Sequence, residues 1–166
     1  MKNTMRIAAL LLALLMMVSA LVSCEEQEKE SGEDSAFCVV YDGVRIELGK
    51  PAEKILEALG TANSENEIFD CGEGNSRVRY RYDSLTLYVM KSDGDEVVDQ
   101  IELLDDLAET SRGICIGDSE EKVREAYGTP SSEQGGILGY GKGGMQIEFD
   151  LADGKVSGIG LLRRTK

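Results

Sequence analysis

The chain contains no histidine, which removes the commonest general base and the commonest metal ligand. It has no CxxC pair, and Cys38, Cys71 and Cys115 lie too far apart for a local zinc site. Neither a pair of catalytic carboxylates nor a catalytic lysine can be recognised. These absences predict a noncatalytic protein with no metal and no cofactor. The alternative is a surface enzyme or enzyme inhibitor that acts through loop or carboxylate residues.

Basic residues are also scarce, since 18 Lys and Arg stand against 31 Asp and Glu, and the formal net charge is −13. Nucleic acid carries the same sign of charge and is therefore excluded as a partner. Residues 25–35 are the most acidic part, with six acids, one lysine and no apolar side chain. Their composition is typical of a solvated tether.

Only one long apolar run is present, from Ile7 to Val22, and Ser19 alone interrupts it. The run is shorter than the roughly 20 residues that a membrane-spanning helix needs. Lys2 and Arg6 precede it and small residues follow, which favours an export signal over a permanent transmembrane helix.

Residues 21–24, Leu-Val-Ser-Cys, resemble the lipobox of bacterial lipoproteins. The resemblance implies cleavage before Cys24, a diacylglyceryl group on its thiol, and anchoring at the extracytoplasmic face of the cell membrane. Each buried acyl methylene contributes about 0.8 kcal/mol, and two chains hold a protein stably. The alternative is an ordinary signal peptide with an incidental cysteine. We therefore expect a signal peptide over 1–23 and a lipidated acidic tether over 24–35.

Three cysteines remain beyond the anchor, an odd number for an exported protein. Cys38 and Cys71 could form a disulfide, because both lie in the first half of the domain. Alternatively all three stay reduced as small buried hydrophobes.

Residues 48–61 match residues 116–129 without a gap, with Gly, Glu, Lys, Glu, Ala, Gly and Thr in common. The match predicts a duplicated unit, over 36–105 and 106–166. Each copy has apolar residues at helical spacing, which predicts a short helix ended by Gly60 or Gly128. Pro51 is expected in the first turn of one helix, and Asp118 is expected to cap the other with Glu121 as a capping box.

Alternating patterns over residues 77–82 and 85–90 predict strands. The dipeptides Asp42-Gly43, Asp93-Gly94 and Asp153-Gly154 predict hairpin turns. Each unit is thus expected to contain a strand, a helix and a meander of three strands. The predicted fold class is α+β, with two tandem repeats that each pack a short helix on an antiparallel sheet.

Residues 113–119, 126–130 and 153–156 resemble the repeat signature of tandem helix-on-sheet lipoproteins of Firmicutes, whose fold is similar to that of the β-lactamase inhibitory protein. The resemblance implies fold and placement in the cell envelope. It does not extend to inhibitory activity, because no motif here matches the inhibitor's contact residues.

Six glycines surround Tyr140 over residues 135–144, but the GK[ST] ending and the capped helix of a phosphate-binding loop are missing. This segment is therefore expected to form a flexible strand and turn. Tyr80, Tyr82, Tyr127 and Tyr140 are expected to pack in the core and on the sheet.

Arg77, Arg79 and Arg81 alternate along one predicted strand and so share one face, with Thr86 and Tyr88 nearby. With Tyr88 they form a candidate surface for an acidic or carboxylate-bearing partner, held by forked guanidinium contacts. The alternative is an ordinary solvated ladder paired with Glu102 and Glu148 on neighbouring strands. The predicted function is a lipid-anchored envelope protein that presents a sheet surface to an unknown protein or small ligand.

Overall fold

Strands dominate the fold. In the computed structural model, which describes residues 35–69 and 76–164, they hold 54% of the described residues, and helices hold 14%. The helical elements are η2 (Ser35–Phe37), α2 (Glu53–Leu59) and α3 (Glu120–Tyr127). The strands are β1 (Cys38–Tyr41), β2 (Val44–Glu47), β3 (Ser64–Phe69), β4 (Ser76–Arg81), β5 (Leu85–Ser92), β6 (Asp95–Leu103), β7 (Glu109–Thr110), β8 (Ser132–Gln134), β9 (Ile137–Lys142), β10 (Met145–Ala152) and β11 (Lys155–Arg163).

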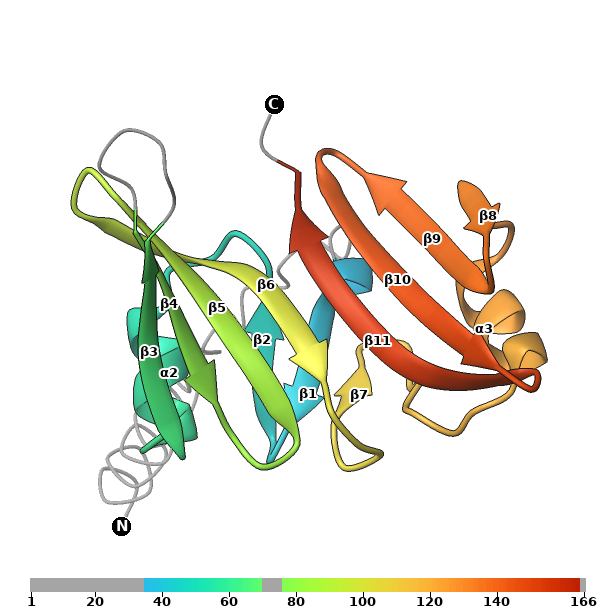
Figure 1. The fold of residues 1–166 in the computed structure, drawn as a ribbon, viewed down its shortest axis with the longest axis horizontal. Helices are drawn as coiled ribbons and strands as arrows, with labels where there is room; N and C mark the ends of the chain where they lie inside the picture. Colours follow the sequence, from blue (N-terminus) through green and yellow to red (C-terminus); the bar gives the residue numbers. More distant parts are fainter. Residues whose placement is uncertain (1–34, 70–75, 165–166) are drawn as a thin grey trace, which may run out of the picture. The chain divides into compact units, whose positions relative to one another are not determined.

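Two antiparallel sheets form from these strands (Figure 1). The larger has eight strands in the order β3-β4-β5-β6-β11-β10-β9-β8. Its two halves join where β6 pairs with β11, with Ile101 opposite Leu161 and Leu103 opposite Ile159. The smaller sheet has the order β2-β1-β7.

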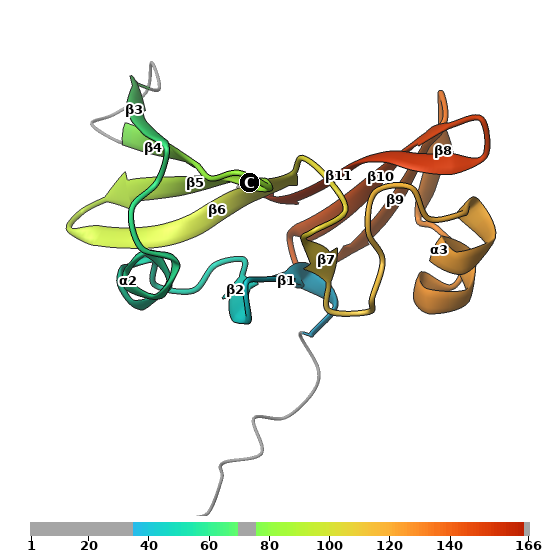
Figure 2. The same ribbon diagram turned by 90° about the horizontal axis from the view of Figure 1, so that it is seen from below.

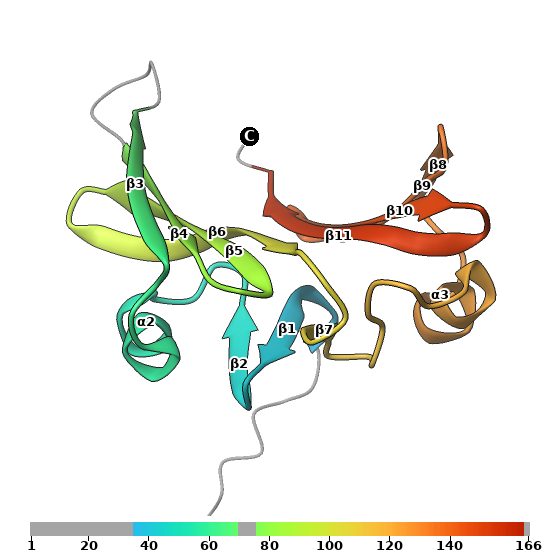
Figure 3. The ribbon, with the colours of Figure 1, turned by 60° about the horizontal axis from the view of Figure 1, so that its bottom comes forward.

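The core lies between the large sheet and the elements on one side of it. Figures 2 and 3 show α2, α3 and the three-stranded sheet on the same side of the eight-stranded sheet. Large side chains from both layers are fully buried there, among them Ile46, Leu85, Ile101 and Phe149. No described element lies on the other side, and the outer strands bend toward it, so the uncovered face is concave (Figure 3).

The predicted fold class, α+β with two tandem repeats that each carry a helix on its own sheet, is wrong. The structure is mostly β, with sheets of three and eight strands. The two helices among the described residues have only seven and eight residues. Strand periodicity shows which residues form strands but not which strands pair with one another. The pairing of β6 with β11 therefore could not be predicted from any local pattern of residues.

The three predicted hairpin turns are confirmed. They connect β1 to β2, β5 to β6 and β10 to β11. The aspartate in each has positive φ, 50° at Asp42, 51° at Asp93 and 51° at Asp153, and the next glycine is also positive. Two consecutive positive φ values define the type I′ turn, which matches the twist of the paired strands.

The predicted helix ends are right and the predicted starts are not. Gly60 and Gly128 follow α2 and α3 with φ of 71° and 79°. Pro51 precedes α2, forming a bridge with Val97 instead of its first turn. The cap of α3 is Ser119, whose Oγ accepts from the Lys122 backbone N–H at 3.2 Å.

Asp118 lies just before α3 and holds the loop that leads into it. Its Oδ2 accepts from the Cys115 backbone N–H at 2.9 Å and from Lys122 Nζ at 2.8 Å. Burial acts to raise the pKa of Asp118, but the Lys122 ammonium and the Cys115 donors outweigh it and lower the pKa below its ordinary value. The folded loop therefore favours the ionised carboxylate.

The tyrosines pack on the sheet, as predicted. Tyr127, Tyr140 and Phe149 form an aromatic cluster under the second half of the sheet, with ring centroids 5.0 to 5.9 Å apart. Tyr140 donates to the Gly128 carbonyl at 3.3 Å, and Tyr82 donates to the Gly60 carbonyl at 3.4 Å. Each helix C-terminus is thereby tied to the sheet. The glycine-rich segment forms β9 and its flanking turns, which confirms the predicted strand and turn.

Two edge strands, β3 and β8, were not predicted. Apart from Ile68 and Phe69 the residues of both strands are polar, so neither shows the alternation of a half-buried strand. Charged and polar side chains on edge strands discourage pairing with another chain.

Several predictions fall outside the described residues, namely the signal peptide, Cys24, the tether up to residue 34, and Cys71. Cys38 is fully buried at the start of β1, and Cys115 is half-buried. The described residues belong to one compact unit. In the described part of the chain, every helix is too short or too polar to cross a membrane.

Candidate functional site

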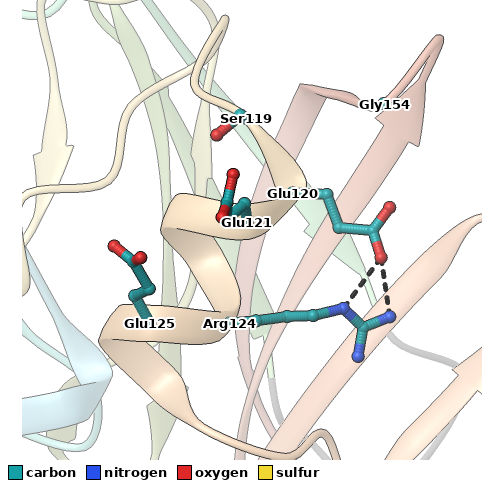
Figure 4. A pocket seen from close by; sticks show the side chains of 6 residues that line it. All are labelled: Ser119, Glu120, Glu121, Arg124, Glu125 and Gly154. Carbon is teal, nitrogen blue, oxygen red and sulfur yellow. Dashed lines mark hydrogen bonds and ion pairs between the residues drawn. The ribbon is translucent and has the colours of Figure 1, made fainter.

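One hollow lies beside the start of α3, but its only arginine already pairs with two carboxylates. It has a volume of about 660 Å³ and is lined by Ser119, Glu120, Glu121, Arg124, Glu125 and Gly154 (Figure 4). Arg124 Nη2 lies 2.7 Å from Glu120 Oε1 and 2.8 Å from Glu133 Oε1. The one cation is thus neutralised within the protein, and the other acids are exposed to water.

The uncovered face of the eight-stranded sheet is the stronger candidate site. Its side chains alternate along each strand with those of the core, so their positions follow from strand register. The central residues of this face are Arg77, Arg79 and Arg81 on β4; Thr86 and Tyr88 on β5; Gln100 and Glu102 on β6; Gly158, Gly160 and Leu162 on β11; and Gln146, Glu148 and Asp150 on β10.

Arg77 belongs to the framework of this face. Its Nη2 lies 2.5 Å from Oδ2 of Asp99, which is only 3% exposed. Asp99 is the unpaired residue of a β-bulge, because Tyr88 pairs with Gln100 and Val89 pairs with Val98. A β-bulge changes the direction in which a side chain points. Here it directs the buried carboxylate of Asp99 toward Arg77, which neutralises it.

Arg79 and Arg81 remain exposed, and neither forms an ion pair with any described residue. The predicted partners Glu102 and Glu148 lie two and four strands away from β4, respectively. One strand step is about 4.8 Å, so Glu148 is beyond the reach of an arginine on β4. The three arginines share a face as predicted, but Asp99 neutralises one of them and leaves two available.

Tyr88 connects the arginines with the acidic part of the face. Its hydroxyl donates to Glu102 Oε2 at 3.2 Å, and Gln100 Nε2 donates to Glu102 Oε1 at 2.8 Å. Burial raises the pKa of the Tyr88 phenol and the charge of Glu102 raises it further, which together outweigh the lowering effect of the neighbouring Arg79. Tyr88 therefore stays protonated and orients the Glu102 carboxylate without neutralising it.

A second feature of the face, which we call the Gly160 notch, is the gap above Gly160 between Glu102 and Glu148. Gly160 pairs with Glu102 on one side and with Glu148 on the other. The notch is part of a hollow of about 320 Å³ that also includes Gly158 and Asp150. Gln146 donates to Glu148 Oε1 at 2.7 Å, so this carboxylate is also held in place by a neutral amide.

The uncovered face carries charged side chains of both signs. The described residues include no group of three His, Cys, Asp or Glu side chains placed to hold a metal ion. Cationic side chains lie over β4, and carboxylates lie over β6 and β10. Such a surface can bind charged groups of both signs.

Sequence reasoning found the arginines and Tyr88 but missed Asp99 and the notch. One signal for the notch was present in the sequence, since Gly158 and Gly160 alternate with Ile159 and Leu161 after the Asp153-Gly154 turn. Glycine within a strand often marks a place where a ligand or another backbone approaches closely.

Comparison with known proteins gives no relative from which a site could be transferred. No family model, no curated protein and no solved structure matches this chain.

Proposed function

We propose that this chain is a noncatalytic envelope lipoprotein, anchored through Cys24, whose uncovered sheet face binds a protein or ligand outside the cell. The observation that carries the proposal is the difference between the two faces of the large sheet. Helices and the small sheet bury one face, while the other presents charged side chains to solvent. Arg79 and Arg81 have no carboxylate partner among the described residues.

Two features of the sequence support the placement. The first is the order of basic residues, apolar run and Leu-Val-Ser-Cys, which is the pattern of an acylated export signal. The second is the acidic composition of residues 25–35, which suits a solvated link between lipid and folded unit. The resemblance of residues 113–119 and 126–130 to envelope lipoproteins agrees with this placement.

Photocrosslinking from defined positions tests the proposal. Tyr88 is replaced by photoreactive benzoylphenylalanine in the acylated full chain, and intact cells are irradiated. The matched control carries the same group at Glu57, an exposed residue of α2 on the covered side of the sheet. We expect a discrete adduct from position 88 that the Glu57 control does not give. Adducts that are identical from both positions, or their absence at position 88, would contradict the proposal.

A further inference from the structure

Strand register places five residues of the uncovered face in one row across the sheet. Arg81 pairs with Thr86, Thr86 with Glu102, Glu102 with Gly160, and Gly160 with Glu148. A cation thus lies at one end of the row, and two carboxylates flank a glycine at the other. The neighbouring row adds Arg79 beside Arg81 and Tyr88 beside Thr86.

We propose that the occupant of this face is an extended protein segment of mixed charge. It places a basic side chain in the Gly160 notch and an acidic side chain against Arg79 and Arg81. The inference rests on the proposed function and specifies the partner's chemistry. Complementary charge at both ends would select the partner and its direction along the row.

The glycine at position 160 has no explanation within the fold. A Cβ at Gly160 would meet no atom within 4 Å, and its φ lies outside the positive region that favours glycine. By contrast, a Cβ at Gly139 would collide with the Ser132 hydroxyl, which would have to move to make room for it. Glycine in a central strand lowers stability, and the open space above Gly160 suits an incoming side chain.

The carboxylates that flank the notch have neutral hydrogen-bond donors and no cationic partner among the described residues. Glu102 accepts from Tyr88 and Gln100, and Glu148 accepts from Gln146, and all three donors are neutral. Neither glutamate forms an ion pair with a described residue. The strand of Gly160, β11, lies between β6 and β10, which carry the two glutamates and are therefore two strand steps, about 10 Å, apart. One ammonium or guanidinium group fits between the two carboxylates.

The distance along the row sets the spacing of charges in the partner. Three strand steps separate Arg81 from Gly160, which is about 14 Å. In an extended segment, side chains on one face recur every second residue and advance about 3.3 Å per residue. An acid and a base four positions apart therefore span about 13 Å and match the row.

Selection from a random library of displayed 12-residue peptides tests the inference. The target is the acylated full chain in detergent micelles. The affinity of the best synthesised peptide is then measured by fluorescence anisotropy against the wild-type chain and three variants. Gly160→Thr fills the notch, Glu102→Gln with Glu148→Gln removes its charge, and Arg79→Glu with Arg81→Glu reverses the opposite end. Melting temperatures of all variants verify folding, and Gly160→Thr is expected to melt no lower than wild type.

We expect selected peptides to carry an acid and a base about four positions apart, and each variant to weaken binding at least tenfold. Replacing the peptide's acid by lysine should restore affinity for the Arg79→Glu, Arg81→Glu variant. Peptides that Gly160→Thr blocks but that lack this charge pair would overturn the inference and leave the proposed function standing. Selection of no peptide that Gly160→Thr blocks would also overturn the inference, and the crosslinking experiment at position 88 would then decide the proposed function separately.

Discussion

Truncation of Arg77 to alanine should destabilise the protein far more than the same change at Arg79, two residues along the same strand. Arg77 Nη2 lies 2.5 Å from Asp99, whose carboxylate is 3% exposed, whereas Arg79 is exposed and has no ion pair with a described residue. Removal of one partner of a buried pair leaves an uncompensated charge and costs about 3 to 5 kcal/mol. The Arg77 side chain is itself 33% exposed, so water can approach Asp99 after truncation. We therefore expect the lower end, about 3 kcal/mol.

Urea unfolding of the full chain in detergent micelles, followed by circular dichroism, measures this difference. With a denaturant slope of about 1.5 kcal/mol per M, the midpoint of Arg77→Ala should fall by about 2 M. Arg79→Ala should change the free energy of unfolding by no more than about 0.5 kcal/mol. Equal midpoints for these two variants would refute the assignment of Arg77 to the framework.

A double variant separates the buried charge from lost packing. Asp99→Asn removes the charge that Arg77→Ala leaves unpaired, so Arg77→Ala with Asp99→Asn should be more stable than Arg77→Ala alone. A double variant as unstable as the sum of both single changes would mean that the ion pair is not the source of the effect.

Three further predictions concern the core, the loop before α3 and the anchor. Phe149→Ala should lower the free energy of unfolding in urea by about 3 to 5 kcal/mol, because the ring is fully buried; a loss below about 1 kcal/mol would contradict this packing. The pKa of Asp118 is lowered in the folded state. The ionised carboxylate therefore contributes fully to the free energy of unfolding above the pKa of the unfolded state, and this contribution is lost as pH falls through the pKa of the folded state. The stability difference between wild type and Asp118→Asn should therefore shrink in melting experiments below about pH 3.8, and a difference that grows there would reverse the assigned sign. Cys24→Ala should abolish incorporation of labelled palmitate and release the chain from membranes. Unchanged labelling of this variant would contradict acylation at Cys24.

Local structure follows closely from local sequence in this chain. The three Asp-Gly dipeptides form hairpin turns because both residues adopt positive φ, which aspartate tolerates and glycine favours. Gly60 and Gly128 end their helices for a related reason, since a positive φ stops a helix at little cost in glycine. Helix starts were harder to predict, because Asp118 and Ser119 are both good caps, and only the fold decides which one accepts from the Lys122 backbone N–H.

The candidate site was only partly predictable. Alternation placed Arg77, Arg79 and Arg81 on one face, which the register of β4 and β5 bears out. The partner of Arg77 could not be found in this way, because a bulge in β6 turns Asp99 out of the alternating pattern. Glu102 and Glu148 were named as partners for the arginines, but in the sheet they lie on either side of Gly160.

By itself, the sequence determined the turns, the helix ends, the identity of most strands and the excess of acidic charge, since each depends on residues close together in the chain. Tertiary structure alone decided that β6 pairs with β11. That pairing joins segments more than fifty residues apart, merges all eight strands into one sheet and brings Glu102, Gly160 and Glu148 side by side. It depends on burying one face of both strands over a shared core, and no local pattern of residues encodes it.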